Sequence, residues 1–230
     1  MKTIILNHKG YLTYDEIKKY KTELEKINNN NVNLVLMPNL AYISMFKDYK
    51  IKIGAQNFYS YNLGSYTGEI PLESLKSMNI KYTMVGHPER ITLKLDSYEE
   101  IKEKLYRSLN SGFKTILCIG HDEKLSTVKK ELKYYLKTAD YIDIKNLIIA
   151  YEPSSKIEKE EVNLKDINYL NNFIKEYFMY EFEEEVPFLY GGSVTSENIS
   201  EILKITDGVI IGKNSIDIKQ VKEILNKITK

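Results

Sequence analysis

Short apolar stretches alternate with longer amphipathic stretches along most of the chain. The short stretches are rich in Val, Ile and Leu and do not alternate with polar residues, which is typical of strands buried on both faces. They predict eight strands, at residues 3–6, 34–37, 51–55, 82–85, 115–119, 147–151, 188–190 and 209–211.

The segments between these strands carry apolar residues at steps of three and four, the spacing of an amphipathic helix. Ile17, Tyr20 and Leu24 show this spacing in the first segment. Pro88 suits the first position of a short helix. The longer predicted helices are residues 14–27, 97–109, 123–136, 164–182, 195–203 and 218–228, and a shorter one ends near Met78.

Strands that alternate with helices imply parallel pairing, and eight such units close into a (β/α)8 barrel. The 230 residues are enough, because such barrels typically have about 250 residues and tolerate about 200. We therefore expect an α/β fold, a (β/α)8 barrel that forms a single domain over residues 1–230. The alternative is an open doubly wound sheet, but the glycine-rich phosphate turn expected after an early strand of such a sheet is absent from the sequence.

Charge and composition narrow the possible partners and location. The net charge is +1, and of the basic residues only Arg90 and Arg107 are arginines, so we expect no nucleic-acid partner. The single cysteine, Cys118, excludes a disulfide within the chain and fits a core position. No apolar run approaches the roughly 18 residues that span a bilayer, and the N-terminal run is too short for a signal peptide. We expect a soluble cytoplasmic protein with no membrane partner.

The residues that follow the predicted strands are candidates for chemistry, because active sites of barrels lie at the C-terminal ends of their strands. Lys9 follows the first strand and could bind an anion, although an ordinary surface lysine is the commoner outcome. His87 follows the fourth strand, directly before Pro88. A helix N-terminus disfavours imidazolium, so His87 could be a neutral electrophile or proton shuttle, or only a capping or core residue.

Glu152 follows the sixth strand. A carboxylate at the end of a buried strand has a raised pKa unless it is paired, and a raised pKa suits a general base. The alternative is a structural salt bridge. No His, Cys, Asp or Glu cluster has the spacing of metal ligands, and we expect neither a metal nor another cofactor.

Two glycine turns follow the last two strands, Gly191-Gly192-Ser193 and Gly212-Lys213. Glycine lets the backbone approach a ligand, and successive backbone N–H groups can hold an anion. The loops after strands seven and eight often form the phosphate site of such barrels, although each turn alone is ordinary. We expect Gly191, Gly192, Ser193, Gly212 and Lys213 to bind substrate.

Taken together, these segments resemble the triosephosphate isomerase family over nearly the whole chain. The segments that carry the resemblance are residues 54–57, 66–70, 117–120, 149–153 and 190–194, in the order and spacing of the family. The resemblance implies a TIM barrel that isomerises glyceraldehyde 3-phosphate and dihydroxyacetone phosphate through an enediol(ate), in glycolysis and gluconeogenesis. It also implies a small phosphorylated sugar as substrate and a homodimer.

The same resemblance assigns roles to individual residues. It makes Glu152 the base that moves a proton between adjacent carbons, and neutral His87 the group that shuttles protons at the two oxygens. It makes Lys9 and Asn7 the residues that bind substrate and stabilise the enediolate. Glu89 and Arg90 become a supporting pair beside His87. Thr67 reaches from one subunit into the active site of its partner.

The chain departs from the family in the loop after the sixth strand. The family reads Glu-Pro-Val-Trp-Ala-Ile-Gly-Thr-Gly there, whereas this chain places Ser155 at the tryptophan and Glu158-Lys159-Glu160 at the end of the motif. His121 replaces a glutamate that supports the tryptophan, and Lys213 replaces the second glycine after strand eight. Lys213 could contact phosphate or pair with Glu158.

Three hypotheses remain open from the sequence. The chain is a triosephosphate isomerase with a variant loop, a relative that isomerises another small sugar phosphate, or a non-catalytic binding protein on a retained barrel. The intact set of Lys9, His87 and Glu152 argues against the third.

Overall fold

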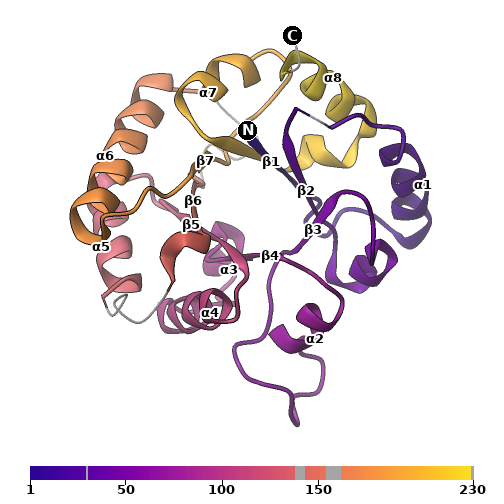
Figure 1. Cartoon of the computed structure of the whole chain (residues 1–230), viewed down its shortest axis with the longest axis horizontal. Helices are drawn as coiled ribbons and strands as arrows, with labels where there is room; N and C mark the ends of the chain where they lie inside the picture. The colour runs from indigo at the N-terminus through magenta and orange to yellow at the C-terminus, as the bar shows by residue number, and fades with distance from the viewer. Residues whose placement is uncertain (30, 138–142, 154–161, 229–230) are drawn as a thin grey trace.

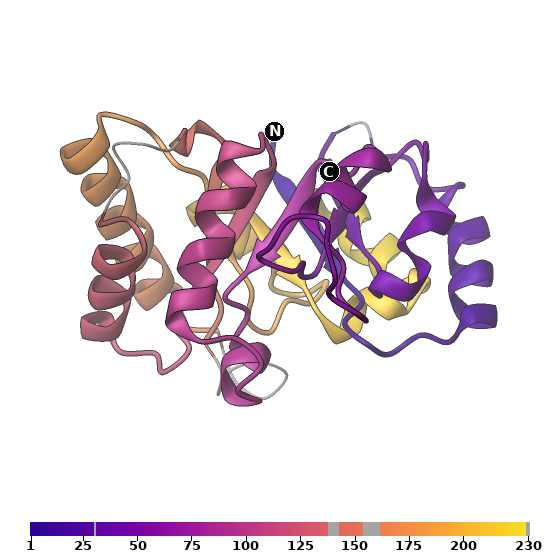
Figure 2. The same ribbon diagram turned by 90° about the horizontal axis from the view of Figure 1, so that it is seen from below.

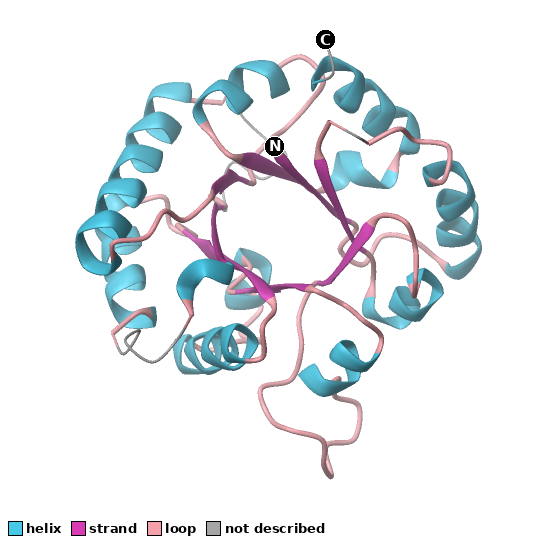
Figure 3. Ribbon diagram, viewed as in Figure 1, coloured by secondary structure: helices cyan, strands magenta, loops and turns pink. Residues whose placement is uncertain are grey.

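Eight parallel strands form a closed barrel in the computed structural model, which describes residues 1–29, 31–137, 143–153 and 162–228 (Figures 1 and 3). The strands follow one another around the barrel in chain order, and β1 pairs with β8 to close it, with Ile4 opposite Val209. Their bounds are β1 Thr3–Asn7, β2 Asn33–Met37, β3 Lys52–Ala55, β4 Tyr82–Val85, β5 Lys114–Ile119, β6 Leu147–Tyr151, β7 Phe188–Tyr190 and β8 Gly208–Ile211.

The helices surround the barrel (Figure 3). The α-helices are α1 Tyr14–Leu24, α2 Leu72–Ser77, α3 Pro88–Thr92, α4 Tyr98–Asn110, α5 Leu125–Tyr135, α6 Leu164–Phe182, α7 Ile199–Ile205 and α8 Ile218–Ile228. The 3-10 helices are η1 Leu40–Phe46, η3 Ile144–Asn146 and η5 Lys213–Ile216. None of the described helices is both long and apolar enough to cross a membrane. The single-domain (β/α)8 barrel predicted from the sequence is therefore confirmed.

The strands bury both faces, which explains their continuous apolar sequence. Along β1, Ile5 belongs to a cluster made only of strand residues, inside the barrel. Its neighbours Ile4 and Leu6 belong to the larger cluster that also contains helix residues. Cys118 lies in the inner cluster and is buried, as its position in an apolar run predicts.

Among the segments that differ from the sequence-based prediction, two do so where side chains compete for the backbone. The helix predicted from residue 195 begins at Ile199, since Asn198 accepts a hydrogen bond from the Thr195 N–H at 2.9 Å and forms a turn first. The 3-10 helix η1 was not predicted. It begins where the Asn39 side chain accepts a hydrogen bond from the Ala41 N–H at 2.9 Å.

The long connection between β3 and α2 projects beyond the ring of helices (Figures 1 and 2). A backbone hydrogen bond of 2.8 Å from the Tyr59 N–H to the Ile70 carbonyl closes its base. The rings of Tyr59, Tyr61 and Tyr66 pack against one another within it. It is thus a structured projection, which we call the β3–α2 projection (residues 56–71).

Candidate active site

The main cavity, of about 360 Å³, opens at the C-terminal ends of the strands. All nine residues that we expect from the sequence to act in catalysis or substrate binding lie in its wall. They are Asn7, Lys9, His87, Glu152, Gly191, Gly192, Ser193, Gly212 and Lys213. The closed barrel brings them together, because the ends of β1, β4, β6, β7 and β8 meet at one mouth.

Glu152 and His87 face each other at the bottom of this cavity. The distance from His87 Nε2 to Glu152 Oε2 is 2.9 Å, and the side chains are 7% and 2% exposed. The Glu152 N–H continues the sheet by donating to the Ile119 carbonyl at 3.1 Å. A buried carboxylate and an imidazole in contact form the arrangement that proton transfer requires.

Glycine at position 191 makes room for the Glu152 side chain. A Cβ at that position would lie 2.4 Å from Glu152 Cγ and 2.5 Å from Oε1, closer than real Cβ contacts. The Gly191 N–H also donates to the Tyr151 carbonyl at 2.9 Å, so the two loops are joined. The first glycine of the turn after β7 is therefore required by the carboxylate as well as by any anion.

His87 caps helix α3, and the cap defines its tautomer. Its Nδ1 accepts a hydrogen bond from the Glu89 N–H at 3.3 Å, which requires Nδ1 without a proton and leaves the proton of the neutral ring on Nε2. Pro88 occupies the first turn of α3, as predicted. The protonated Nε2 of this tautomer lies 2.9 Å from Glu152 Oε2.

Two opposing effects act on the pKa of His87. Burial lowers it, but the charge of the adjacent Glu152 carboxylate, together with that of Glu89, outweighs burial and raises the pKa above its ordinary value. The expectation from the sequence considered only the helix N-terminus, which disfavours imidazolium. The pKa of His87 thus depends on the charge of Glu152, a contact that the sequence does not reveal.

Lys9 is held in place by its neighbours. It adopts a left-handed backbone conformation with φ of 49°, which costs about 1 kcal/mol in a residue other than glycine. Its N–H donates to Asn7 Oδ1 at 3.1 Å, and its carbonyl accepts from the Gln56 side chain at 3.0 Å. Its Nζ lies 2.7 Å from Glu89 Oε1. Glu89 therefore supports Lys9 directly, in addition to its backbone contact with His87.

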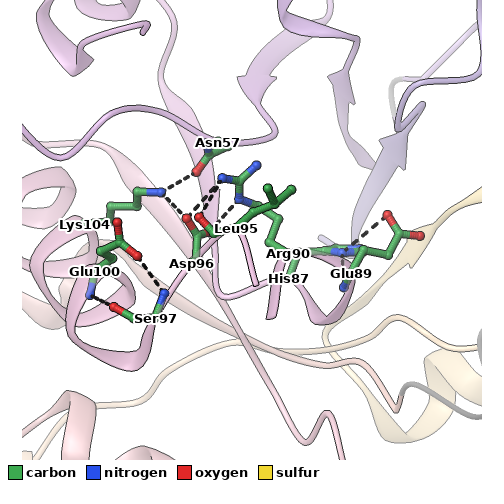
Figure 4. Close-up of polar contacts among 9 residues, drawn as sticks. All are labelled: Asn57, His87, Glu89, Arg90, Leu95, Asp96, Ser97, Glu100 and Lys104. Carbon is green, nitrogen blue, oxygen red and sulfur yellow. Dashed lines mark hydrogen bonds and ion pairs between the residues drawn. The ribbon is translucent and has the colours of Figure 1, made fainter. Parts of the chain in front are cut away.

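Arg90 supports the site from outside the main cavity. Its Nε and a second guanidinium nitrogen contact the two oxygens of Asp96 at 2.5 and 3.1 Å (Figure 4). Lys104 contacts the same carboxylate at 2.6 Å and Asn57 Oδ1 at 2.9 Å. The Asp96 side chain is only 1% exposed, so its charge is compensated by two cations. This network ties α3 to α4 and to the base of the β3–α2 projection.

Asp96 and Lys104 were not predicted as site residues. Lys104 lies on the apolar face of α4 beside Ile101 and Leu105, and a lysine in such a stripe indicates a buried anionic partner. Asp96 directly precedes Ser97, which caps α4 together with Glu100. The lysine in the apolar stripe of α4 could have predicted a buried acidic partner for Lys104. It could not have predicted that Arg90 contacts the same carboxylate.

A second cavity lies beside the main one. It shares Asn7, Lys9 and His87 with the main cavity and is otherwise lined by residues that include Glu89, Arg90, Leu93 and Leu95. Leu93 and Leu95 are 66% and 54% exposed, which is unusual for two leucines so close together. Thr67 lies on the β3–α2 projection, is exposed, and lines neither cavity.

The loop after β6 in which the sequence departs from the family, with Ser155, Glu158, Lys159 and Glu160, lies outside the described residues. His121, the other departure near it, has a partner of its own. Its Nδ1 lies 2.7 Å from Glu131 Oε1, and the other oxygen of this buried carboxylate accepts from the Gly120 N–H at 2.9 Å. His121 is thus anchored to α5.

The fold and the site define an α/β-barrel enzyme in which a carboxylate, an imidazole and a lysine converge at the ends of the strands. A family model described as triosephosphate isomerase matches residues 2–228. The chain therefore belongs to the triosephosphate isomerase family and is an isomerase, which confirms the resemblance stated from the sequence.

Several curated relatives have the same name. The triosephosphate isomerase of Ureaplasma parvum serovar 3 is 33% identical, with 99% of each chain covered. That of Orientia tsutsugamushi (strain Ikeda) is 31% identical, with 98% of this chain and 97% of the relative covered. That of Helicobacter acinonychis (strain Sheeba) is 36% identical over 182 residues, which is 76% of each chain.

Proposed function

We propose that this protein interconverts glyceraldehyde 3-phosphate and dihydroxyacetone phosphate, a step of glycolysis and gluconeogenesis. The observation that carries the proposal is the contact of 2.9 Å between Glu152 and His87 in a cavity that Lys9 also lines. A volume of about 360 Å³ suits a small substrate. The family and the names of its members support the triose phosphate as that substrate.

The proton transfer at carbon is assigned to Glu152. Its carboxylate takes a proton from the carbon next to the substrate carbonyl, and the electrons of the broken C–H bond form the C–C double bond of an enediolate. The carbonyl oxygen receives the negative charge. Protonated Glu152 then returns the proton to the carbon that carried the carbonyl, while His87 passes its Nε2 proton to the first oxygen and takes the hydroxyl proton from the second. The aldehyde thus becomes a ketone without any external oxidant or reductant.

His87 serves the two oxygens. Its Nε2–H donates to the oxygen that becomes negative, while Nδ1 stays bonded to the Glu89 N–H. Once Glu152 is protonated, the charge that raises the pKa of His87 is gone, and burial favours the neutral ring. The first proton transfer thus prepares His87 to act as a neutral hydrogen-bond donor.

Lys9 and Asn7 stabilise the enediolate in this proposal. The ammonium of Lys9 is fixed by Glu89 and by the loop contacts of its backbone, so no reorganisation is needed as negative charge develops. The backbones of Gly191, Gly192, Ser193 and Gly212 also line the cavity, and the N–H groups of Gly192 and Gly212 can hold the phosphate.

The test is isomerase turnover of the purified protein, measured next to a Glu152→Gln variant purified in the same way. We expect turnover of the triose phosphates by the wild type and almost none by the variant, which also controls for a contaminating host isomerase. Four- and five-carbon sugar phosphates are assayed in parallel. Turnover of only a longer sugar would favour the related isomerase with another substrate, and no turnover would contradict the proposal.

We also propose that the protein is a cytoplasmic homodimer in which Thr67 reaches the partner's active site. The support is the β3–α2 projection, with exposed Tyr61 and Leu63, together with the exposed leucines of the second cavity beside Lys9. Burying such apolar surface favours association. Sedimentation equilibrium tests the dimer, and a monomer at micromolar concentration would contradict it.

A further inference from the structure

Lys213 stands at the end of the main cavity that faces the two glycine turns. It is the first residue of η5, directly after Gly212 and the end of β8. It lines the cavity together with Gly191, Gly192 and Ser193, and it is exposed to solvent. Lys213 therefore belongs to the part of the wall that would meet an anionic group.

The two lysines of the cavity differ in how their charges are used. Lys9 is paired with Glu89 at 2.7 Å. Lys213 makes no ion pair with any acidic side chain in the described parts of the chain. Among the described residues, the charge of Lys213 is thus uncompensated, whereas that of Lys9 is partly compensated by Glu89.

Lys213 determines whether the main cavity and its surroundings carry a net negative charge, which would oppose the binding of an anion. The ionisable residues in the cavity wall are Lys9, Lys213, Glu152 and His87, which carry +1 in total when His87 is neutral (+1 +1 −1). When Glu89, which is paired with Lys9, is counted as well, the sum is zero with Lys213 and −1 without it. Without Lys213, the net charge of the site would therefore repel a phosphate dianion.

The position of Lys213 along the cavity also suits the phosphate end. A Cβ on Gly212 would lie 3.4 Å from Lys9 Cε and 3.6 Å from Nζ, so the side chain of Lys9 reaches the residue next to Lys213. Lys9 thus lies beside the residue that precedes Lys213, so that one small substrate can contact both lysines.

A cavity next to the main one is unsuited to anions. A further cavity of about 290 Å³ shares Thr195 and Asn214 with the main one and is lined by Glu197 and Glu223. Hydrogen bonds from Thr195 and Ser196 hold the pKa of Glu197 below its ordinary value, so it is ionised at neutral pH. A phosphate is thus attracted as far as Lys213 and repelled beyond it.

We infer that Lys213 binds the phosphate of the substrate through its side chain and sets the preference for substrates with a single phosphate at that end. The inference rests on the proposed function, and it adds a side-chain cation to a wall that otherwise offers backbone N–H groups.

The direct test is calorimetric titration with inorganic phosphate, which requires no turnover. We expect Lys213→Gln to weaken phosphate binding about tenfold or more, because it removes a cation about 4 Å from the anion. Lys213→Arg should stay within about threefold of the wild type, since the charge is kept. The matched control is Lys219→Gln, which removes the same charge from an exposed site on α8 outside the cavity and should leave the affinity unchanged.

Kinetics separate this inference from the proposed function. For the triose phosphate, Lys213→Gln should raise KM with little change in kcat. Wild-type affinity for phosphate in Lys213→Gln would overturn the inference even if the enzyme is active. Weakened phosphate binding in a protein without isomerase turnover would support the inference and sink the proposed function.

Discussion

The two ends of the main cavity differ in how their polar groups are paired. At the chemical end, which comprises Lys9, His87 and Glu152, each side chain has a partner within 3 Å. At the anion end, which comprises the two glycine turns and Lys213, the lining is mostly backbone, and the only cationic side chain has no acidic partner among the described residues. Residues that must move protons are thus fixed in advance, whereas the anion-binding end leaves its charge for the ligand.

This difference shows where the sequence can vary. A change at the chemical end disturbs several contacts at once, because Glu89 touches Lys9 with its carboxylate and His87 with its backbone. A change of the Lys213 side chain alters one contact with the ligand, whereas Gly191 at the same end also contacts Glu152. The sequence agrees with this difference, because Lys9, His87 and Glu152 match the family whereas Lys213 departs from it.

The largest expected effect is at the chemical end itself. Glu152→Asp withdraws the carboxylate from the substrate and from His87 by about one bond, and we expect kcat to fall about 10³-fold with little change in stability. Steady-state turnover and thermal unfolding measure the two quantities. A loss of less than tenfold would mean that Glu152 is not the base.

The second prediction concerns the contact between the two ends, where Gly191 of the anion end packs against Glu152 of the chemical end. Gly191→Ala places a Cβ 2.4 Å from the present position of Glu152 Cγ and forces the carboxylate to move. We expect kcat to fall about 10²-fold, the usual consequence of displacing a catalytic group by about 1 Å. Gly212→Ala is the matched control, because its Cβ would only reach van der Waals distance of Lys9. Equal effects of both variants would contradict this interpretation.

The third prediction concerns the layer beneath the chemical end. His8 lies between Asn7 and Lys9, and burial lowers its pKa from 6.5 to about 4, despite a backbone hydrogen bond at Ser215. Below pH 6.5 the unfolded chain binds a proton that the folded chain does not, so this stability is present above pH 6.5 and is lost as the pH falls toward 4.

Between pH 7 and pH 5 this loss amounts to about 2 kcal/mol. We expect His8→Phe, which keeps a ring beside Tyr20, to lack that part of the acid sensitivity. Urea unfolding of both proteins at the two pH values measures the difference. Equal losses in both proteins would show that His8 does not titrate in this way.

The smallest expected effect tests whether Glu89 only positions Lys9 or takes part in catalysis itself. Glu89→Gln removes the partner of Lys9 but keeps the backbone N–H that bonds His87. Because Glu89 is half-exposed, the pair is screened by solvent, and we expect kcat/KM for the triose phosphate to fall about tenfold or less. A loss as large as that of Glu152→Asp would place Glu89 among the catalytic residues.

The sequence predicts the barrel and the placement of the site for one physical reason. Strands buried on both faces are continuously apolar, so their ends are visible in the sequence, and the closed barrel brings those ends together. This is why Lys9, His87 and Glu152 could be assigned to one mouth before any distance was known.

What the sequence does not predict depends on contacts between distant segments. The sharing of Asp96 by Arg90 and Lys104 joins three elements, and its geometry follows only from their packing. The raised pKa of His87 depends on Glu152, which lies far away in the sequence. The start of α7 depends on a local competition between the Asn198 side chain and the backbone, which an apolar pattern does not contain.

The central claim is that Glu152 moves a proton between two carbons of the substrate. Conversion of glyceraldehyde 3-phosphate in D₂O, followed by NMR, tests it most directly, because a proton held on a carboxyl group can exchange with solvent before it is returned. The account predicts dihydroxyacetone phosphate with deuterium on the carbon that receives the proton, and no such product with Glu152→Gln. Conversion by Glu152→Gln at the wild-type rate, with or without deuterium in the product, would contradict it.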